Sequence, residues 1–151
     1  DVKIGTMIEL PRAALVADRI AEVADFFSFG TNDLTQYTMA ADRMQGALSD
    51  LLDPWQPAVL RLIQHTCIVG QANNVAVGVC GEAAADPMLA CVLTGLGVNS
   101  LSAASTAVAG VGAQLAEITL EQCQQLAEVA LDAESPDAAR TAVVETMASF
   151  A

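Results

Sequence analysis

A short apolar run breaks into a polar loop in the stretch Asp25-Phe26-Phe27-Ser28-Phe29-Gly30-Thr31-Asn32-Asp33-Leu34. The run over 25–29 is apolar and short, which predicts a strand. The Gly-Thr-Asn-Asp sequence over 30–33 predicts a turn, and a short helical piece is expected over 34–41. The stretch therefore indicates one strand-then-helix unit with polar side chains at the end of its strand.

Two further stretches have the same design, Met7-Ile8-Glu9 and Val79-Cys80-Gly81-Glu82. In each, an apolar run ends in a polar or reactive side chain and a helix-type pattern follows. Repeated units of this kind bring their strand ends to the same edge of a parallel sheet or barrel. That edge is where such folds carry their chemistry, so the three stretches predict one divided active site.

The rest of the chain continues the alternation of strands and helices. Strands are expected over 3–10, 25–29, 75–80 and 98–103, and helices over 11–24, 34–41, 57–71, 87–95 and 106–116. Two more helices are expected after the capping-box pair Thr119 and Gln122 and after Ser135-Pro136. The fold class is α/β, with about four strand-helix units over 1–117 and a helical tail over 118–151 packed on the same domain.

Four such units are half of what a closed barrel needs. A TIM-type (β/α)8 barrel takes about 250 residues, and an open four-stranded sheet leaves two strand edges unpaired. The sequence therefore predicts half of a barrel. It is a piece of a longer protein, or one of two copies that complete each other, or a unit whose edges are covered in some other way. A chain that begins directly in a strand favours the piece of a longer protein.

The composition argues against a membrane protein and against a nucleic-acid-binding protein. Hydrophobic residues make up 54% of the chain and charged residues 16%. The sequence shows no long apolar run and no basic-then-apolar leader, so a cytoplasmic protein without a membrane span is expected. The net charge of -12 makes nucleic acid an unsuitable partner. A phosphorylated ligand would need a metal ion or nearby arginines to offset this charge.

The cysteines and the single histidine carry weaker signals. The four cysteines show no CxxC spacing, which argues against a zinc site, and three of them fall in apolar patterns typical of buried thiols. His65 lies within a predicted helix, and we interpret it as a surface or core histidine rather than a catalytic one.

Glu9 and Asp33 follow neighbouring strands and are separated by one helix, so both are expected within reach of one cation. Carboxylates suit Mg²⁺, which keeps several waters and takes one or two protein carboxylates together with substrate oxygens. In the alternative interpretation, Glu9 only favours the positive end of a helix and Asp33 caps a turn. The residues by themselves leave both interpretations open.

Three more residues are candidates for binding or chemistry. Asn32 would present its amide beside Asp33, and Arg43 would return over the loop to offer donors to a phosphate or carboxylate, although loop arginines are usually solvated. Cys80 ends a strand. A free thiol has a pKa of roughly 8.5, so at neutral pH it can donate a proton as well as attack. No nearby base indicates a thiolate nucleophile, and the alternative for Cys80 is a buried core cysteine.

Together these motifs resemble the phosphoenolpyruvate (PEP)-binding barrel of the PEP-utilising enzymes. The resemblance is carried by Ile4-Gly5-Thr6-Met7-Ile8-Glu9-Leu10-Pro11, Phe27-Ser28-Phe29-Gly30-Thr31-Asn32-Asp33-Leu34-Thr35-Gln36-Tyr37-Thr38, Asp42-Arg43 and Cys80-Gly81-Glu82. Within that family, the stretch from Asp42 to Ile63 is more similar to enzyme I of the bacterial sugar phosphotransferase system than to pyruvate phosphate dikinase or PEP synthase. The similarity covers about residues 2–115 and implies the C-terminal half of the barrel.

The resemblance also implies a reaction. The family member moves phosphoryl from PEP to a histidine on a separate domain and on to the carrier protein HPr, with release of pyruvate. By position, Glu9 and Asp33 match its magnesium ligands. Asn32, Asp33 and Arg43 match the residues that hold PEP. Cys80 matches the acid that protonates the enolate at C3.

The resemblance also predicts that residues 1–151 lack part of the groups needed for phosphotransfer. The family's phosphoacceptor histidine lies in an N-terminal domain, and further phosphate-holding arginines come from the first barrel strands. His65 does not match the phosphoacceptor motif. We therefore expect residues 1–151 alone to bind PEP weakly with magnesium and not to complete phosphotransfer. Two alternatives stay open, a fragment of a dikinase or synthase and a module for dimerisation only. A homodimer is expected because the family's barrel is its dimer-forming part.

Overall fold

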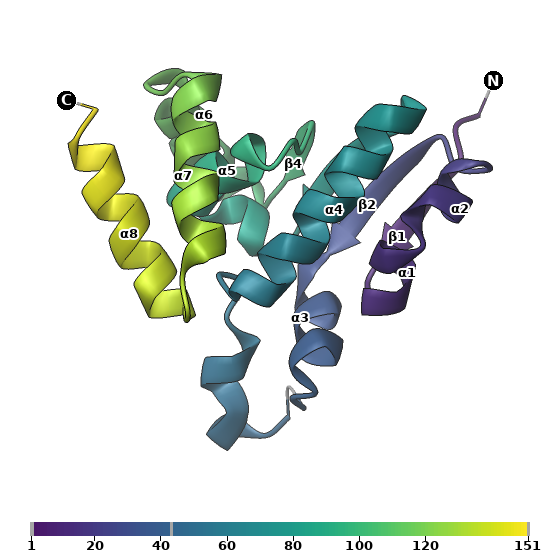
Figure 1. The fold of residues 1–151 in the computed structure, drawn as a ribbon, viewed down its shortest axis with the longest axis horizontal. Helices are drawn as coiled ribbons and strands as arrows, with labels where there is room; N and C mark the ends of the chain where they lie inside the picture. Colours follow the sequence, from purple (N-terminus) through teal and green to yellow (C-terminus); the bar gives the residue numbers. More distant parts are fainter. Residues whose placement is uncertain (1, 43, 151) are drawn as a thin grey trace.

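A parallel sheet of four strands, in the order β1-β2-β3-β4, forms the centre of the computed structural model, which describes residues 2–42 and 44–150 (Figure 1). The strands are β1 (Gly5–Ile8), β2 (Phe26–Gly30), β3 (Ala76–Cys80) and β4 (Ser100–Ser102). The α-helices are α1 (Pro11–Leu15), α2 (Ala17–Ala21), α3 (Thr31–Met39), α4 (Pro57–Asn73), α5 (Pro87–Gly95), α6 (Ser105–Ala116), α7 (Leu120–Asp132) and α8 (Pro136–Ala148). Two 3-10 helices are η1 (Gly46–Leu52) and η2 (Ala83–Ala85). None of the helices in the described part of the chain is long and apolar enough to cross a bilayer.

This architecture confirms the predicted α/β class. Each strand is followed by at least one helix, and all neighbouring strands pair in parallel. Parallel strands joined by helical crossovers are the building unit of α/β sheets and barrels. The arrangement is therefore consistent with part of an α/β barrel.

The two faces of the sheet differ in burial. Alternate residues of a strand point to opposite faces. One alternate set contributes Ile8, Phe27, Phe29, Val77 and Val79 to the hydrophobic core, and each of these is at most 1% exposed. None of the other set is buried, and it forms three register rows: Gly5, Phe26 and Ala76, then Met7, Ser28, Gly78 and Ser100, and then Gly30, Cys80 and Ser102. Helix α4 covers the first face (Figure 1), whereas every described strand residue of the second face is at least partly exposed.

Two predicted elements differ from the structure by more than two residues at an end. The helix expected over 11–24 is divided at Val16, whose φ of -110° and ψ of 26° are not helical. Val16 is β-branched, which weakens helical preference, and Ala14 and Ala17 on either side of the division are both fully buried. The turn expected over 30–33 is wrong beyond Gly30, because α3 begins at Thr31. Asn and Asp are common both in turns and in the first turn of a helix, so these residue types did not distinguish a turn over 30–33 from the start of α3.

The tail is tied to the strand-helix units by its helices. The predicted helix starts are confirmed, with a capping box formed by Thr119 and Gln122 and with Ser135 as the N-cap of α8. Helix α7 packs closely on α5 at Gly95. A Cβ added to this glycine would collide with the main-chain carbonyl of Cys123, so the close approach requires glycine. Arg61 of α4 donates a hydrogen bond of 2.6 Å from Nη2 to the carbonyl oxygen of Leu131. The tail thus shares one core with the sheet.

A second set of polar contacts joins α8 to the segment before α4, and we call Asp53, Trp55, Asp86 and Arg140 the tail clasp. Arg140 pairs with Asp53, with Nη1 2.7 Å from Oδ2 and Nη2 2.8 Å from Oδ1. Its guanidinium lies 5.4 Å from the centroid of the Trp55 ring. The buried Trp55 donates from Nε1 to Asp86 Oδ2 at 3.0 Å, and Asp86 also caps α5.

Candidate active site

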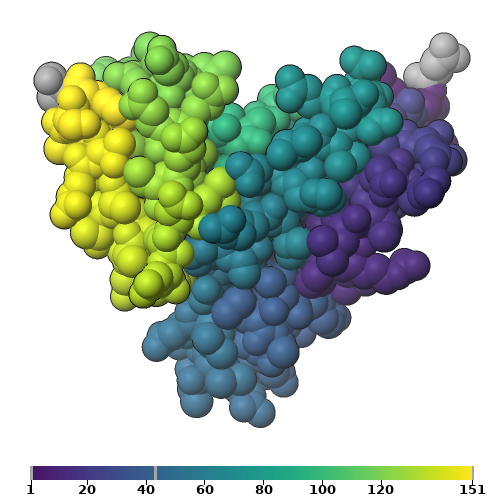
Figure 2. Space-filling view, in the orientation of Figure 1, coloured from purple at the N-terminus to yellow at the C-terminus, as the bar shows by residue number. Residues whose placement is uncertain are grey.

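The four strands end on one edge of the sheet, where the predicted motifs meet. The register places Ile8 beside Phe29, Gly30 beside Cys80, and Cys80 beside Ser102. Beyond this edge, α3 and η1 form a lobe that projects from the rest of the molecule (blue in Figure 2). We call the polar residues of these strand ends the carboxyl edge: Glu9, Asn32, Asp33, Cys80 and Glu82.

Gly30 brings Glu9 to the start of α3. A Cβ at position 30 would collide with Oε1 of Glu9, so the carboxylate lies directly over this glycine. Gly30 is the N-cap of α3, and Asp33 is half-buried in the first turn of the same helix. The positive end of a helix favours nearby carboxylates. The structure therefore gathers Glu9 and Asp33 at one helix start.

This pair fits the donor set expected for Mg²⁺. Both side chains offer only oxygen ligands, and the glycine leaves the space that Glu9 occupies. No group of three or more His, Cys, Asp or Glu side chains among residues 2–42 and 44–150 is arranged to hold a metal ion. A magnesium ion does not require a third protein carboxylate, because water and substrate oxygens complete its coordination.

Asn32 has a partner from another loop. Its Nδ2 donates a hydrogen bond of 2.7 Å to Oε2 of Glu82, fifty residues further along the chain. Gly81, with a φ of +94°, makes the sharp turn that directs Glu82 back toward α3. The contact joins the second and third motifs.

Cys80 differs from the other three cysteines. Its Sγ donates to the main-chain oxygen of Phe29 at 3.2 Å, and the residue is only partly buried. Cys67, Cys91 and Cys123 are buried. Burial raises the pKa of Cys67 and of Cys91 to about 12 and also raises the pKa of Cys123, so these thiols stay protonated and inert. Cys80 is therefore the cysteine that solvent and ligands can reach.

The remaining predicted residues are not joined to this edge by the described contacts. Arg43 lies outside the described residues. Arg61 and Arg140 contact the tail and the tail clasp instead. His65 is exposed on α4, as expected for a surface histidine, and no hydrogen bond links it to the carboxyl edge within the described ranges.

Sequence reasoning gave no role to two residues that the structure brings to the site. Glu82 holds Asn32, and Ser102 lies beside Cys80 in the register and accepts a main-chain hydrogen bond of 3.0 Å from Gly81. The signal for Glu82 was its position two residues after Cys80, beyond a glycine. Its partner was not predictable, because the contact depends on how two loops face each other.

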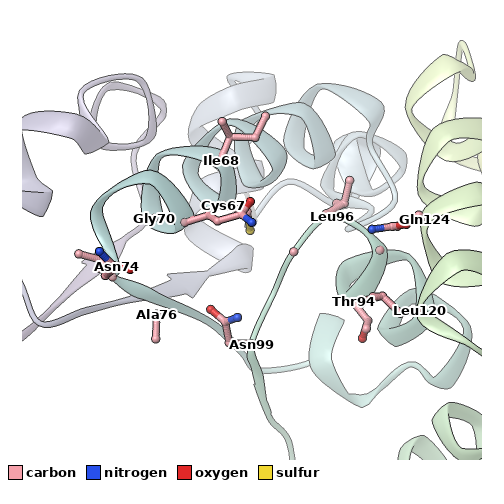
Figure 3. A pocket seen from close by; sticks show the side chains of 14 residues that line it. Cys67, Ile68, Gly70, Asn74, Ala76, Thr94, Leu96, Asn99, Leu120 and Gln124 are labelled. Atoms are coloured by element: carbon pink, nitrogen blue, oxygen red, sulfur yellow. The ribbon is translucent and has the colours of Figure 1, made fainter.

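A hollow lies at the opposite, amino end of the sheet (Figure 3). This cavity of about 520 Å³ is lined by parts of α4, β3, α5 and α7, including Cys67, Thr94, Asn99 and Gln124. None of the described residues that line it is charged. A phosphorylated anion would find no charge partner among them, so the cavity does not suit such a ligand.

Known proteins match the chain in the region that carries these motifs. The family described as PEP-utilising enzyme, PEP-binding domain, matches residues 1–120. The phosphoenolpyruvate-protein phosphotransferase of Streptomyces coelicolor is 54% identical over 140 residues, which are 93% of this chain and 25% of the relative. That of Bacillus subtilis is 38% identical over 146 residues, 97% of this chain and 26% of the relative.

A second type of relative has the same region within a longer protein. The multiphosphoryl transfer protein of Rhodobacter capsulatus is 49% identical over 130 residues, 86% of this chain and 16% of the relative. The chain thus spans about a quarter or less of the length of these relatives. The match over residues 1–120, together with the convergence of the three motifs, shows that the chain belongs to the PEP-utilising enzymes and contains their PEP-binding domain.

Proposed function

We propose that residues 1–151 form the C-terminal half of a TIM-type (β/α)8 barrel that binds PEP in a phosphotransferase. The whole enzyme would move phosphoryl from PEP to a histidine on a separate domain and on to HPr, releasing pyruvate. Four parallel strands, one partly exposed sheet face and two open strand edges support the half barrel. The names of the relatives favour a phosphotransferase over a dikinase or synthase.

In this proposal the carboxyl edge binds the ligand. Glu9 and Asp33 hold Mg²⁺, which supplies charge neutralisation for a phosphorylated anion when it is bound. Asn32 contributes its amide to the phosphate or carboxylate of PEP, with Arg43 as a second donor. A bound cation is needed here because the chain carries a net charge of -12 and repels free anions.

Cys80 has the role of proton donor. In its contact of 3.2 Å with the Phe29 carbonyl oxygen the thiol is the donor, because a carbonyl can only accept. When the phosphoryl group leaves PEP, the enolate would take this proton at C3 to become pyruvate. Cys80 would become a thiolate and recover its proton from water.

The meeting of Glu9, Asn32 and Cys80 at one edge carries the proposal. A direct test follows the modification rate of Cys80 by a thiol reagent in the full chain at pH 8. We expect one thiol to react quickly in the folded chain, and PEP with Mg²⁺ to slow that reaction. PEP with EDTA and inorganic phosphate with Mg²⁺ are the controls.

Matched variants assign the protection to the site. Cys80→Ser should remove the fast-reacting thiol, and Glu9→Gln should keep the thiol but lose at least about tenfold of the protection by PEP and Mg²⁺. An unchanged rate of Cys80 modification at saturating PEP and Mg²⁺ would show that this chain does not bind PEP at the carboxyl edge.

The same proposal makes a negative prediction about phosphotransfer. PEP carrying a labelled phosphoryl group should not label residues 1–151, with or without HPr, because the proposed phosphoacceptor histidine lies on a separate domain and His65, on α4, does not match its motif. Acid-labile label on the chain, measured after separation under alkaline conditions, would contradict it. A complete phosphotransferase from Bacillus subtilis is the positive control.

The proposal also covers assembly and location. The partly exposed sheet face and the edges β1 and β4 favour a homodimer, which sedimentation velocity would detect as twice the mass of 15.6 kDa. A monomer at all concentrations would contradict it. All four cysteines are free, which suits the reducing cytoplasm that we propose as the location.

A further inference from the structure

The hydrogen bond from Asn32 to Glu82 fixes the orientation of the Asn32 amide. An ionised carboxylate only accepts hydrogen bonds, so the NH₂ group of Asn32, and not its oxygen, must face Glu82. The amide oxygen is thereby turned to the opposite side. An isolated surface asparagine would be free to present either group.

The main chain around Glu82 is held in place on both sides. The Gly81 amide donates to the carbonyl of Ser102 at 3.0 Å, and the Ala85 amide donates to the carbonyl of Glu82 at 3.0 Å. Ala83 and Ala84, directly after Glu82, are at most 1% exposed and anchor η2 in the core. The carboxylate therefore extends from a fixed turn.

A second contact ties the same two loops together. Cys80, two residues before Glu82, donates to the carbonyl of Phe29, which is three residues before Asn32. Cys80 is also paired in the sheet with Gly30. The positions of the Asn32 amide and the Cys80 thiol are therefore fixed relative to each other.

We propose that Glu82 is a positioning residue for the ligand site, which holds the Asn32 amide so that its oxygen and second N–H face the place where PEP and its cation bind. This inference rests on the proposed function, because the orientation of Asn32 affects a ligand only if one binds there. It assigns Glu82 no contact with the ligand or the metal ion.

Charge and position make opposite predictions for Glu82. If its charge were all that mattered, Glu82→Ala and Glu82→Gln would both remove a negative charge and tighten binding of an anion. If it positions Asn32, the glutamine keeps an acceptor oxygen and the alanine does not. Only Glu82→Ala should then weaken binding.

The first experiment is calorimetric titration of the full chain with PEP at saturating Mg²⁺. We expect Glu82→Ala to weaken binding about three- to tenfold and Glu82→Gln to stay within about twofold of the original chain. In an Asn32→Ala background, Glu82→Ala should have no further effect, since the group it positions is gone. Glu128→Gln, on the exposed face of α7, is the control for net charge.

The titration overturns the proposal if Glu82→Ala binds as tightly as Glu82→Gln, or if it weakens the Asn32→Ala variant by the same factor. Circular dichroism of each variant shows whether the fold is retained. Because both side chains are exposed, neither substitution leaves a buried cavity.

A second experiment needs no ligand and separates this inference from the proposed function. Nuclear magnetic resonance of the ¹⁵N-labelled chain resolves the side-chain NH₂ of Asn32, which is assigned by its loss in Asn32→Ala. We expect its two proton shifts to be far apart in the original chain, to stay apart in Glu82→Gln, and to converge in Glu82→Ala. Unchanged shifts in Glu82→Ala would overturn the positioning role. If the shifts respond but no variant binds PEP, the proposed function fails and the contact stands.

Discussion

The carboxyl edge and the tail clasp contain similar side chains and use them differently. In the clasp, both oxygens of Asp53 face Arg140, the indole of Trp55 has an acceptor, and Asp86 caps a helix. At the edge, the three carboxylates of Glu9, Asp33 and Glu82 follow three neighbouring strands, and the side-chain contacts there include Asn32 with Glu82 and Cys80 with Phe29.

This difference in pairing indicates that the tail clasp serves stability and the carboxyl edge serves ligand binding. Partly buried acids that are paired with a guanidinium and an indole stabilise the fold they join. Carboxylates of like charge at a surface edge repel each other and gain little stability, so their proximity suits a cation supplied from outside. We therefore expect substitutions in the clasp to change unfolding and substitutions at the edge to change ligand binding.

The largest effect on stability should come from Trp55→Ala. Trp55 is 1% exposed, belongs to the core and carries the clasp's contact with Asp86. Removing a buried indole costs about 3–5 kcal/mol of unfolding free energy through lost burial and the remaining cavity. Urea unfolding followed by circular dichroism measures it, since the variant has no tryptophan fluorescence.

Trp55→Phe is the matched control for this substitution. It keeps an aromatic ring in the core but removes the Nε1 donor and part of the indole volume, so we expect a smaller loss of about 1–2 kcal/mol. If Trp55→Ala lost less than Trp55→Phe, or if it abolished PEP binding at temperatures where it is folded, the division between clasp and edge would be wrong.

The next largest effect should be a pH dependence of stability caused by the buried thiols of Cys67 and Cys91. Burial raises the pKa of Cys67 and of Cys91 from an ordinary value of 9.0 to about 12. Below pH 9 both thiols are protonated whether the chain is folded or unfolded, and stability does not depend on them. Between pH 9 and 12 the unfolded chain releases these protons and the folded chain does not, so stability falls by about 1.4 kcal/mol per pH unit for each thiol.

Urea midpoints measured from pH 7.5 to 10.5 test this slope. Cys67→Ala should lower stability at every pH through lost packing, but its stability should decline less steeply above pH 9. Cys80→Ser, at the carboxyl edge, is the control and should keep the full slope. Equal slopes in all three chains would show that the buried thiols do not determine the alkaline decline.

The fold was largely predictable because its signals are local. Apolar runs that end in glycine predicted β2 and β3, and a proline or a capping residue predicted the starts of α4, α5, α7 and α8. The division at Val16 was not predictable, because it depends on what Ala14 and Ala17 pack against. The register that aligns Gly30 with Cys80 also depends on the whole sheet.

The candidate site was predictable as a list of residues and not as a set of contacts. Strand ends in parallel sheets meet at one edge, which placed Glu9, Asn32 and Cys80 together. Two features of that edge came only from the structure. Gly30 makes the space for Glu9, and Glu82 holds Asn32. Both involve residues far apart in the chain, and neither leaves a mark in local sequence.

Gly30→Ala should test the position of Glu9 at the carboxyl edge most directly. The added Cβ would collide with Oε1 of Glu9, so the carboxylate must move away from the start of α3. We expect a loss of about 1–2 kcal/mol in unfolding free energy, and at least about tenfold weaker protection of Cys80 by PEP and Mg²⁺.

Gly112→Ala is the control, since a Cβ there meets nothing within 4 Å. Gly112 lies inside α6, where alanine is the better helix former, so this variant should be as stable as the original chain or more stable by about 0.5–1 kcal/mol. Its protection by PEP and Mg²⁺ should be unchanged. Full protection in Gly30→Ala would mean that the position of Glu9 over this glycine does not matter for binding.

The smallest effect should be the coupling between Asp53 and Arg140. Their side chains are 22% and 37% exposed, so solvent screens the pair despite its two contacts. A double-mutant cycle with Asp53→Asn and Arg140→Gln should give a coupling of about 0.5–1 kcal/mol in unfolding free energy. Asp53→Asn alone should cost more than this, because Asp53 also accepts a hydrogen bond of 2.9 Å from the Trp55 amide.

Salt distinguishes this pair from a purely structural contact. Raising the ionic strength from 0.05 M to 1 M should reduce the coupling, since screening acts on exposed charges. Arg140→Lys keeps the charge but cannot reproduce the two-point contact or the stacking on Trp55, so it should recover only part of the lost stability. Full recovery by lysine would mean that the clasp works through charge alone, and the geometric contrast with the carboxyl edge would then be weaker than the contacts indicate.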